Sequence, residues 1–220
     1  MTMTSEITRD ARQRDIVPVQ RLAVCQATVV GVGAVGRQVA LQLAAIGVLQ
    51  LQLIDPDEVE VVNLACQGYL EENLGQSKVN ATAELCSRIH PQIQMECETA
   101  RFRRSMEIGS ILFCCVDSIE VRRLIWESTC DRLAFFTDGR MSAEVVRVLT
   151  AADTASRKHY PSTLFTSGQA YQGACTAKST IFAANIAAGL MLSQFSKWLR
   201  RLPVEADLTL NLLSAELTVG

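Results

Sequence analysis

An apolar run that leads directly into a glycine-rich turn constrains this chain more than any other feature. Residues 27–30 are apolar or β-branched, and Gly31, Gly33 and Gly36 follow with the spacing G-x-G-x-x-G. The first glycine permits a tight turn, the second lets a ligand approach the backbone, and the third lets a helix pack against the strand. Because free N–H groups at the start of that helix attract anions, the pattern predicts a phosphate-binding turn.

The segments after this turn alternate between strand-like and helix-like patterns. We expect strands over 27–32, 49–55, 93–96, 111–116, 133–137 and 144–150 (the last a candidate antiparallel strand), helices over 34–46, 76–89, 119–130 and 176–199, and a closing strand or hairpin over 208–219. Gly47 is placed to end the first helix, and Ser118 to cap the third. Residues 56–75 and 152–173 are expected to be long irregular connections. The alternation predicts an α/β fold with a doubly wound, mostly parallel sheet, as a single domain over 1–220 with an N-terminal arm over 1–20.

Composition excludes several classes of protein. A formal net charge of −2 argues against a nucleic-acid surface, residues 1–15 do not resemble a signal peptide, and the apolar stretch 180–192 is short for a membrane span. The eight cysteines include no C-x-x-C pair, so we expect no structural zinc. We therefore expect a cytoplasmic protein without membrane or nucleic-acid partners. Most cysteines are expected in the core, among them Cys86, Cys97, Cys114, Cys115 and Cys130.

Polar residues stand where the expected strands end. Asp55 follows Gly36 by 19 residues, about where a nucleotide-binding fold of this type places a carboxylate for ribose hydroxyls. Asp117 follows the continuous apolar run 111–116. Structural alternatives exist, because Asp55 can cap a strand end, Asp117 can cap a helix, and Lys78 alone is typical of a solvated helix.

Five motifs occur in a fixed order along the chain. They are Gly31–Gly36, Asp55–Glu60, Asn63–Gln67, Gly75–Lys78 and Asp117–Ser118. Together they resemble the ThiF/MoeB/HesA family, the adenylating domains related to ubiquitin-activating enzymes, from about residue 9 to residue 199. A single G-x-G-x-x-G is weak evidence, whereas five motifs in order are strong evidence.

This resemblance implies a Rossmann-like ThiF/MoeB-type adenylation domain that uses ATP and Mg²⁺. The partner implied is a small ubiquitin-like or sulfur-carrier protein that ends in glycine, and the family forms homodimers. The residues implied to bind the nucleotide are Gly31, Gly33, Gly36, Asp55, Asp57, Asn63, Gln67, Lys78 and Arg12. Lys78 and Asp117 are the implied catalytic residues, with Asp117 as a Mg²⁺ ligand or a partner of Lys78. Such groups neutralise charge on the triphosphate while a carboxylate attacks the α-phosphate.

One position departs from the family pattern. Cys66 stands where N-L-x-R-Q has an arginine that contacts the ATP phosphates, and a thiol cannot replace a delocalised cation. Arg12, Arg37 and Arg140 are candidates to supply that charge. Arg12 and the following glutamine resemble a family arm that reaches the ATP site of the partner protomer. We interpret Cys66 itself as an inert substitution and not as a catalytic thiol.

Cys175 is the better candidate for a reactive thiol. It precedes the expected helix 176–199, and Lys178 adds positive charge nearby, which lowers a thiol pKa. Both a thioester-forming role and a role without thioester chemistry stay open.

Three functions are therefore compared: an ATP-dependent adenylyltransferase, a degenerate relative that binds nucleotide or a partner without turnover, and an NAD-dependent dehydrogenase. The dehydrogenase rests on the glycine turn and Asp55 alone. The sequence does not identify the acceptor protein or the reaction that follows adenylation.

Overall fold

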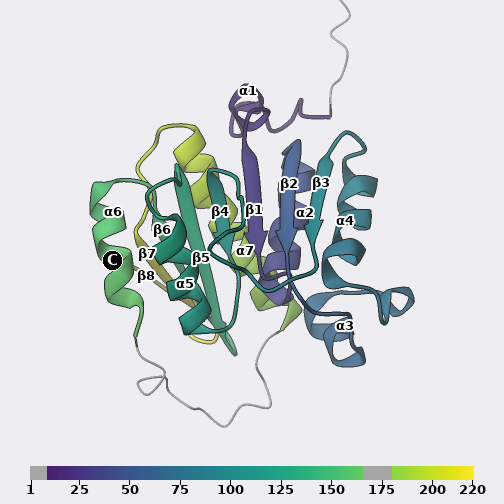
Figure 1. The fold of residues 1–220 in the computed structure, drawn as a ribbon. Helices are drawn as coiled ribbons and strands as arrows, with labels where there is room; N and C mark the ends of the chain where they lie inside the picture. Colours follow the sequence, from purple (N-terminus) through teal and green to yellow (C-terminus); the bar gives the residue numbers. More distant parts are fainter. Residues whose placement is uncertain (1–8, 166–179) are drawn as a thin grey trace, which may run out of the picture.

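Eight strands form one mixed sheet in the computed structural model, which describes residues 9–165 and 180–220 (Figure 1). The strands are β1 Gln26–Val30, β2 Gln50–Ile54, β3 Gln94–Glu98, β4 Ile111–Cys114, β5 Phe135–Ser142, β6 Val145–Ala151, β7 Asp207–Asn211 and β8 Glu216–Val219. Their order is β3-β2-β1-β4-β5-β6-β7-β8. The pairs from β3 to β5 are parallel and those from β5 to β8 are antiparallel. The chain therefore reverses its direction of winding between β1 and β4, which is where such sheets bind ligands.

Helices cover both faces of the sheet (Figure 1). They are α1 Val19–Leu22, α2 Ala34–Ile46, α3 Val61–Gln67, α4 Lys78–Ile89, α5 Ile119–Thr129, α6 Thr154–His159 and α7 Ile181–Leu199, with short 3₁₀ helices η1 Glu71–Asn73 and η2 Tyr160–Thr163. The cores of α2, α4 and α7 lie on one face, and those of α5 and η2 lie on the other. The α/β class and the doubly wound parallel half are confirmed.

Local sequence explains where several helices begin and end. Gly47 ends α2 in the left-handed conformation at φ 104°, and its N–H is directed at the carbonyls of Leu43 and Ala44. The Ser118 hydroxyl accepts a hydrogen bond from the Val121 N–H and so caps α5. Both features agree with the prediction from sequence.

Three segments differ from that prediction. The connection 56–75 is not irregular throughout, because it contains α3 and η1. The connection 152–165 likewise contains α6 and η2. Strand β5 does not stop at Thr137, since the antiparallel ladder with β6 carries it through Asp138, Gly139 and Arg140 to Ser142. The hairpin over 208–219 and the antiparallel strand near 144–150 are confirmed as β7–β8 and β6.

Two apolar clusters fill the space on either side of the sheet. One contains Phe113 and Phe135 against Phe195 of α7, with ring centroids 5.3–6.0 Å apart. In the other, Trp126 of α5 packs edge-to-face on Phe136 and at a tilt on Tyr160. The strands between these clusters are buried on both faces, as their continuous apolar runs predicted. Among the described helices, none has the length and apolar character to cross a membrane.

Candidate active site

The glycine turn lies at the carboxyl end of β1, and its three glycines have different roles. Gly31 has φ +87°, and a Cβ there would lie 2.8 Å from the Cys115 backbone. A Cβ on Gly36 would lie 1.8 Å from the Gly31 carbonyl oxygen. Only Gly33 faces open space, where the nearest atom to an added Cβ would be Gln67 Oε1 at 3.9 Å. Gly31 and Gly36 therefore build the turn, and Gly33 leaves bare backbone for a ligand.

The first turn of α2 follows directly and is electrostatically suited to an anion. It contains no acidic residue, and no side chain caps it at Gly33. Its leading N–H groups are consequently available, and they carry the positive end of the helix dipole. The turn and the helix together fit a phosphate group.

Asp55 connects β2 to this turn. Its Oδ2 accepts a 2.6 Å hydrogen bond from the Val32 N–H, and its Oδ1 accepts one of 2.9 Å from the Asp57 N–H. The side chain is buried, and burial raises the carboxyl pKa, an effect that these two N–H donors oppose. Each oxygen keeps a lone pair, so the carboxylate can still accept from ribose hydroxyls.

Lys78 is the first residue of α4, directly after its cap Ser77. Its stem is buried, and its Nζ lies 3.0 Å from Oδ2 of the exposed Asp57. The partner that sequence reasoning considered was Asp117, but the structure pairs Lys78 with Asp57. Because the Asp57 side chain is exposed, this ion pair reaches the surface of the protein.

Asn63 and Gln67 both project from α3, the helix that the sequence did not predict. Asn63 Oδ1 accepts a 3.0 Å hydrogen bond from the Glu60 N–H, so this side chain supports its own helix start. Gln67 Oε1 is buried and has no donor among the described residues. Since that oxygen lies beside Gly33, it is an unfilled acceptor at the glycine turn.

Cys66 is partly exposed on the same helix. Its Sγ donates to the Val62 carbonyl at 3.2 Å, the usual local bond of a helical thiol. Helix α3 contains no basic residue.

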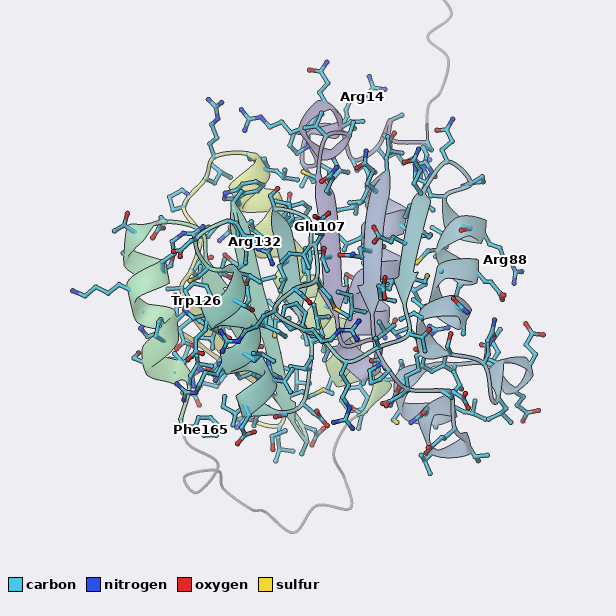
Figure 2. The ribbon with its side chains drawn as sticks, in the orientation of Figure 1. Arg14, Arg88, Glu107, Trp126, Arg132 and Phe165 are labelled. Atoms are coloured by element: carbon cyan, nitrogen blue, oxygen red, sulfur yellow. The ribbon has the colours of Figure 1, made fainter. Side chains whose placement is uncertain are left out.

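The three arginines considered as replacements lie in different places. Arg140 is engaged by Asp138, with Nε to Oδ2 at 2.8 Å, and by Thr163. Arg12 belongs to a segment that binds the far end of α2, where Gln13 donates to the Ile46 carbonyl. Figure 2 shows Arg14 of that segment at the end of the sheet opposite Phe165. A helix of 13 residues spans about 20 Å, so Arg12 cannot reach the glycine turn of its own chain.

Arg37 is the arginine closest to the turn, in the first helical turn of α2. It is 3% exposed, and its guanidinium lies 4.5 Å from the centroid of the Tyr69 ring. The Tyr69 hydroxyl in turn donates to the Val32 carbonyl at 2.7 Å. Arg37 and the glycine turn are thus linked through one aromatic side chain that sequence reasoning did not single out.

Asp117 lies beyond β4, next to the glycine turn. The Cys115 N–H donates to the Val30 carbonyl at 2.8 Å, which fixes the two strand ends together. Asp117 itself is exposed and forms no hydrogen bond or ion pair within the described ranges 9–165 and 180–220. A free carboxylate at this point fits a hard cation such as Mg²⁺, which takes one or two carboxylates plus phosphate oxygens.

A buried ionic cluster behind Asp117 was not foreseen. Asp138 is fully buried and pairs with both Arg122 and Arg140, and it accepts a 2.9 Å hydrogen bond from the Tyr160 hydroxyl. Arg122 also donates to the carbonyl of Val116, the residue before Asp117. The cluster therefore holds the turn that presents Asp117. The sequence-based prediction ended this strand at Thr137 and so did not place Asp138 within the sheet.

The described cysteines are unpaired. Burial raises the pKa of the Cys114 thiol and raises that of Cys86 to about 12, which makes both thiols unreactive. Cys97, Cys115 and Cys130 are partly exposed but pack against the two apolar clusters. Cys175 and Lys178 lie outside the described residues. Within the same described ranges, no group of three or more His, Cys, Asp or Glu side chains is arranged to hold a metal ion.

Two sizeable cavities lie away from this site. One, of about 390 Å³, lies over the amino-terminal half of β1–β3, where the connection after β3 crosses the sheet, and its floor residues Thr28 and Gln52 are hydrogen-bonded to each other at 2.9 Å. Figure 2 shows Glu107 of that connection in front of the strands. The other, of about 430 Å³, is lined by Trp198 and Leu199 at the end of α7. The candidate site at the carboxyl ends of the parallel strands is therefore identified by its polar groups and not by the volume of a cavity.

Comparison with known proteins agrees with this geometry. The profile of the ThiF family matches residues 7–215. The chain belongs to the ThiF family. The resemblance found in the sequence is thereby confirmed, and the glycine turn, α3, α4 and the Asp117 turn all lie within the matched range.

Individual proteins match this chain over part of its length or at low sequence identity. Adenylyltransferase and sulfurtransferase MOCS3-1 of Zea mays is 40% identical over 77 residues, which cover 34% of this chain and 16% of that protein. Ubiquitin-like modifier-activating enzyme 5 of Caenorhabditis briggsae is 33% identical over 113 residues, covering 44% and 26%. The chain thus spans well under two thirds of these relatives. The crystal structure of E. coli MccB with ATP has a TM-score of 0.76 at 12% identity, covering 98% of this chain and 72% of that one, and so shares its fold.

Proposed function

We propose that this ThiF-family chain is an ATP-dependent adenylyltransferase. Its substrate would be the C-terminal carboxylate of a small ubiquitin-like or sulfur-carrier protein ending in glycine. The observation that carries the proposal is the open backbone at Gly33 between the α2 N-terminus, the Asp55 carboxylate and the Lys78 ammonium. The names of the relatives support the reaction class, since one is an adenylyltransferase and another activates a ubiquitin-like modifier.

Each residue has a role that follows from its position. Asp55 accepts from the ribose hydroxyls, and Gly33 lets the phosphates approach the N–H groups of α2. The acceptor carboxylate attacks the α-phosphorus, the bond to the β-phosphate oxygen breaks, and pyrophosphate leaves with its electron pair. Lys78 offsets the negative charge that grows on the phosphates in this step. Asp117 would hold Mg²⁺, which supplies further charge neutralisation when bound.

The remaining proposals concern assembly and location. We expect a homodimer in which Arg12 serves the ATP site of the partner protomer, because it lies about one helix length from its own glycine turn. Asp57, Asn63 and Gln67 are proposed to line the nucleotide site, with Gln67 Oε1 as the free acceptor. The unpaired cysteines favour a cytoplasmic location. Whether Cys175 forms a thioester stays open.

A second candidate function has one observation in its favour. Cys66 removes a cation from α3, and losing a charge-assisted phosphate contact costs about 1.5–3 kcal/mol. A member weakened in this way would bind nucleotide or a partner without turnover.

ATP–pyrophosphate exchange distinguishes the two functions. The purified chain is incubated with ATP, Mg²⁺, labelled pyrophosphate and candidate small proteins that end in glycine. Exchange that depends on one of these proteins supports the adenylyltransferase, whereas ATP binding without exchange for any of them favours the inactive binder. Binding of NAD in place of ATP would contradict both.

Variants then test the assigned residues. Lys78→Ala and Asp117→Ala should nearly abolish exchange. Cys175→Ala is the matched control, because a thioester forms only after adenylation, so exchange should be retained. Normal exchange in either of the first two variants would show that the site is assigned wrongly.

A further inference from the structure

Arg37 is a buried cation without a counter-ion. Its side chain is 3% exposed, yet no carboxylate pairs with it and no acceptor meets its Nε in the part of the chain that the structure describes. The guanidinium makes a cation–π contact with the Tyr69 ring, whose centroid lies 4.5 Å away. Burial consequently lowers the pKa of this guanidinium. A buried charge in this situation is normally paired, so an unpaired one indicates a missing anion.

The other buried cations near the strand ends are satisfied. Lys78 pairs with Asp57, and Arg122 and Arg140 share Asp138. Arg37 differs from all three, because its environment offers a π face but no negative charge.

The guanidinium lies beside the C-terminal cap of α3. Arg37 Nη1 is 3.8 Å from the position that a Cβ on Gly68 would occupy, one residue beyond Gln67. The Tyr69 hydroxyl donates to the Val32 carbonyl in the turn, and the same ring lies 4.5 Å from the guanidinium, so one side chain contacts both. Two buried groups without a partner among the described residues, Arg37 Nε and Gln67 Oε1, thus belong to α2 and α3, and Gln67 Oε1 lies 3.9 Å from the position of a Cβ on Gly33.

We infer that Arg37 supplies the phosphate-binding cation that Cys66 no longer provides from α3, and that with the N–H groups of α2 it binds the phosphates of ATP. This rests on the proposed function for the nature of the ligand. The cation would then come from α2, the helix after the glycine turn, and not from α3. Arg12 and Arg140 do not compete for this role within one chain, since the first lies at the far end of α2 and the second is paired with Asp138.

The test measures ATP and adenosine affinity by calorimetry in wild type, Arg37→Met, Arg37→Lys and Arg37→Met with Cys66→Arg. Arg37→Met should weaken ATP binding about 10- to 150-fold, the range for a charge-assisted hydrogen bond, and leave adenosine binding unchanged. Arg37→Lys should retain part of the affinity. Adding Cys66→Arg to Arg37→Met should recover at least about tenfold, because the family position then carries the charge again.

Stability provides a readout that separates binding from packing. Methionine fills a similar volume and removes an unpaired buried charge, so the ligand-free Arg37→Met variant should melt at or above the wild-type temperature. Unchanged ATP affinity in a folded Arg37→Met variant would overturn the inference. So would a lower melting temperature together with a failure of Cys66→Arg to restore binding.

Cys66→Arg in the wild-type background keeps the inference testable if Arg37→Met does not fold. Residue 66 is partly exposed, so the added side chain does not threaten the core. With Arg37 in place, the gain in ATP affinity should stay below about threefold, whereas a gain of about tenfold would mean that no cation serves the phosphates now. Absence of pyrophosphate exchange would refute the proposed reaction and leave this binding inference standing.

Discussion

Substitution by alanine should have different effects at Gly33 and at Gly36: loss of ATP affinity at the first and loss of stability at the second. At Gly36 a Cβ would lie 1.8 Å from the Gly31 carbonyl oxygen and 3.1 Å from the Cys115 Cβ, so α2 or the turn must move. At Gly33 the nearest atom would be 3.9 Å away, which is ordinary van der Waals contact. Gly36→Ala should therefore lower the stability of the fold. Gly33→Ala should mainly weaken ATP binding, because the added methyl group occupies space that a phosphate would use.

The magnitudes differ enough to measure. Contact with backbone at 1.8 Å is at the severe end of overpacking, about 3 kcal/mol, which lowers the Tm of a domain of this size by about 6–12 °C. Gly33→Ala should lower the free energy of unfolding by about 1 kcal/mol or less, well below the loss at Gly36. It should nonetheless weaken ATP binding about tenfold or more, equal to about 1.4 kcal/mol.

Urea denaturation and ATP titration of both variants and the wild type make this comparison. The reasoning is refuted if Gly33→Ala loses as much stability as Gly36→Ala. It is also refuted if Gly33→Ala binds ATP as tightly as the wild type does, because the open backbone would then serve no ligand.

Three further predictions concern charged side chains. Lys78→Met should abolish exchange but lower the free energy of unfolding by less than about 1 kcal/mol, because its partner Asp57 is 62% exposed; a large loss in urea denaturation would make Lys78 structural. Asp138→Asn should cost about 3–5 kcal/mol in the same assay, because two buried arginines lose their shared carboxylate. Hydrogen bonds from Arg147 lower the pKa of Asp207, so this carboxylate adds stability above its unfolded pKa of about 4 that is lost on further acidification. The stability gap between wild type and Asp207→Asn should thus shrink as the pH falls from about 4 to about 2; a gap that grows over this range would contradict this sign.

The sequence predicted those helix ends that are set by residues close by in the chain. Helix α2 has the predicted ends 34 and 46, because glycines stand at both of its caps. The α3 helix was missed, since seven residues between polar segments give too weak a periodic signal. The extension of β5 to Ser142 was also missed, because its ladder with β6 is a tertiary feature that overrides local propensity.

The same division holds at the candidate site. That Asp55 lies next to the glycine turn follows from the order of the strands. The structure adds the hydrogen bond that its carboxylate accepts from the Val32 N–H. The pairing of Lys78 with Asp57 and the stacking of Arg37 on Tyr69 depend on rotamers and on the position of α3. A sequence lists such cations but does not say which of them finds a carboxylate.

The shared carboxylate of Asp138 has a consequence for how relatives of this chain can diverge. Replacing Asp138 alone leaves Arg122 and Arg140 buried without a carboxylate. Replacing one arginine alone removes the hydrogen bond to the Val116 carbonyl or the one to the Thr163 carbonyl. Single steps away from this arrangement are costly, while a concerted change of all three is not. We therefore expect positions 122, 138 and 140 to covary in an alignment of close relatives.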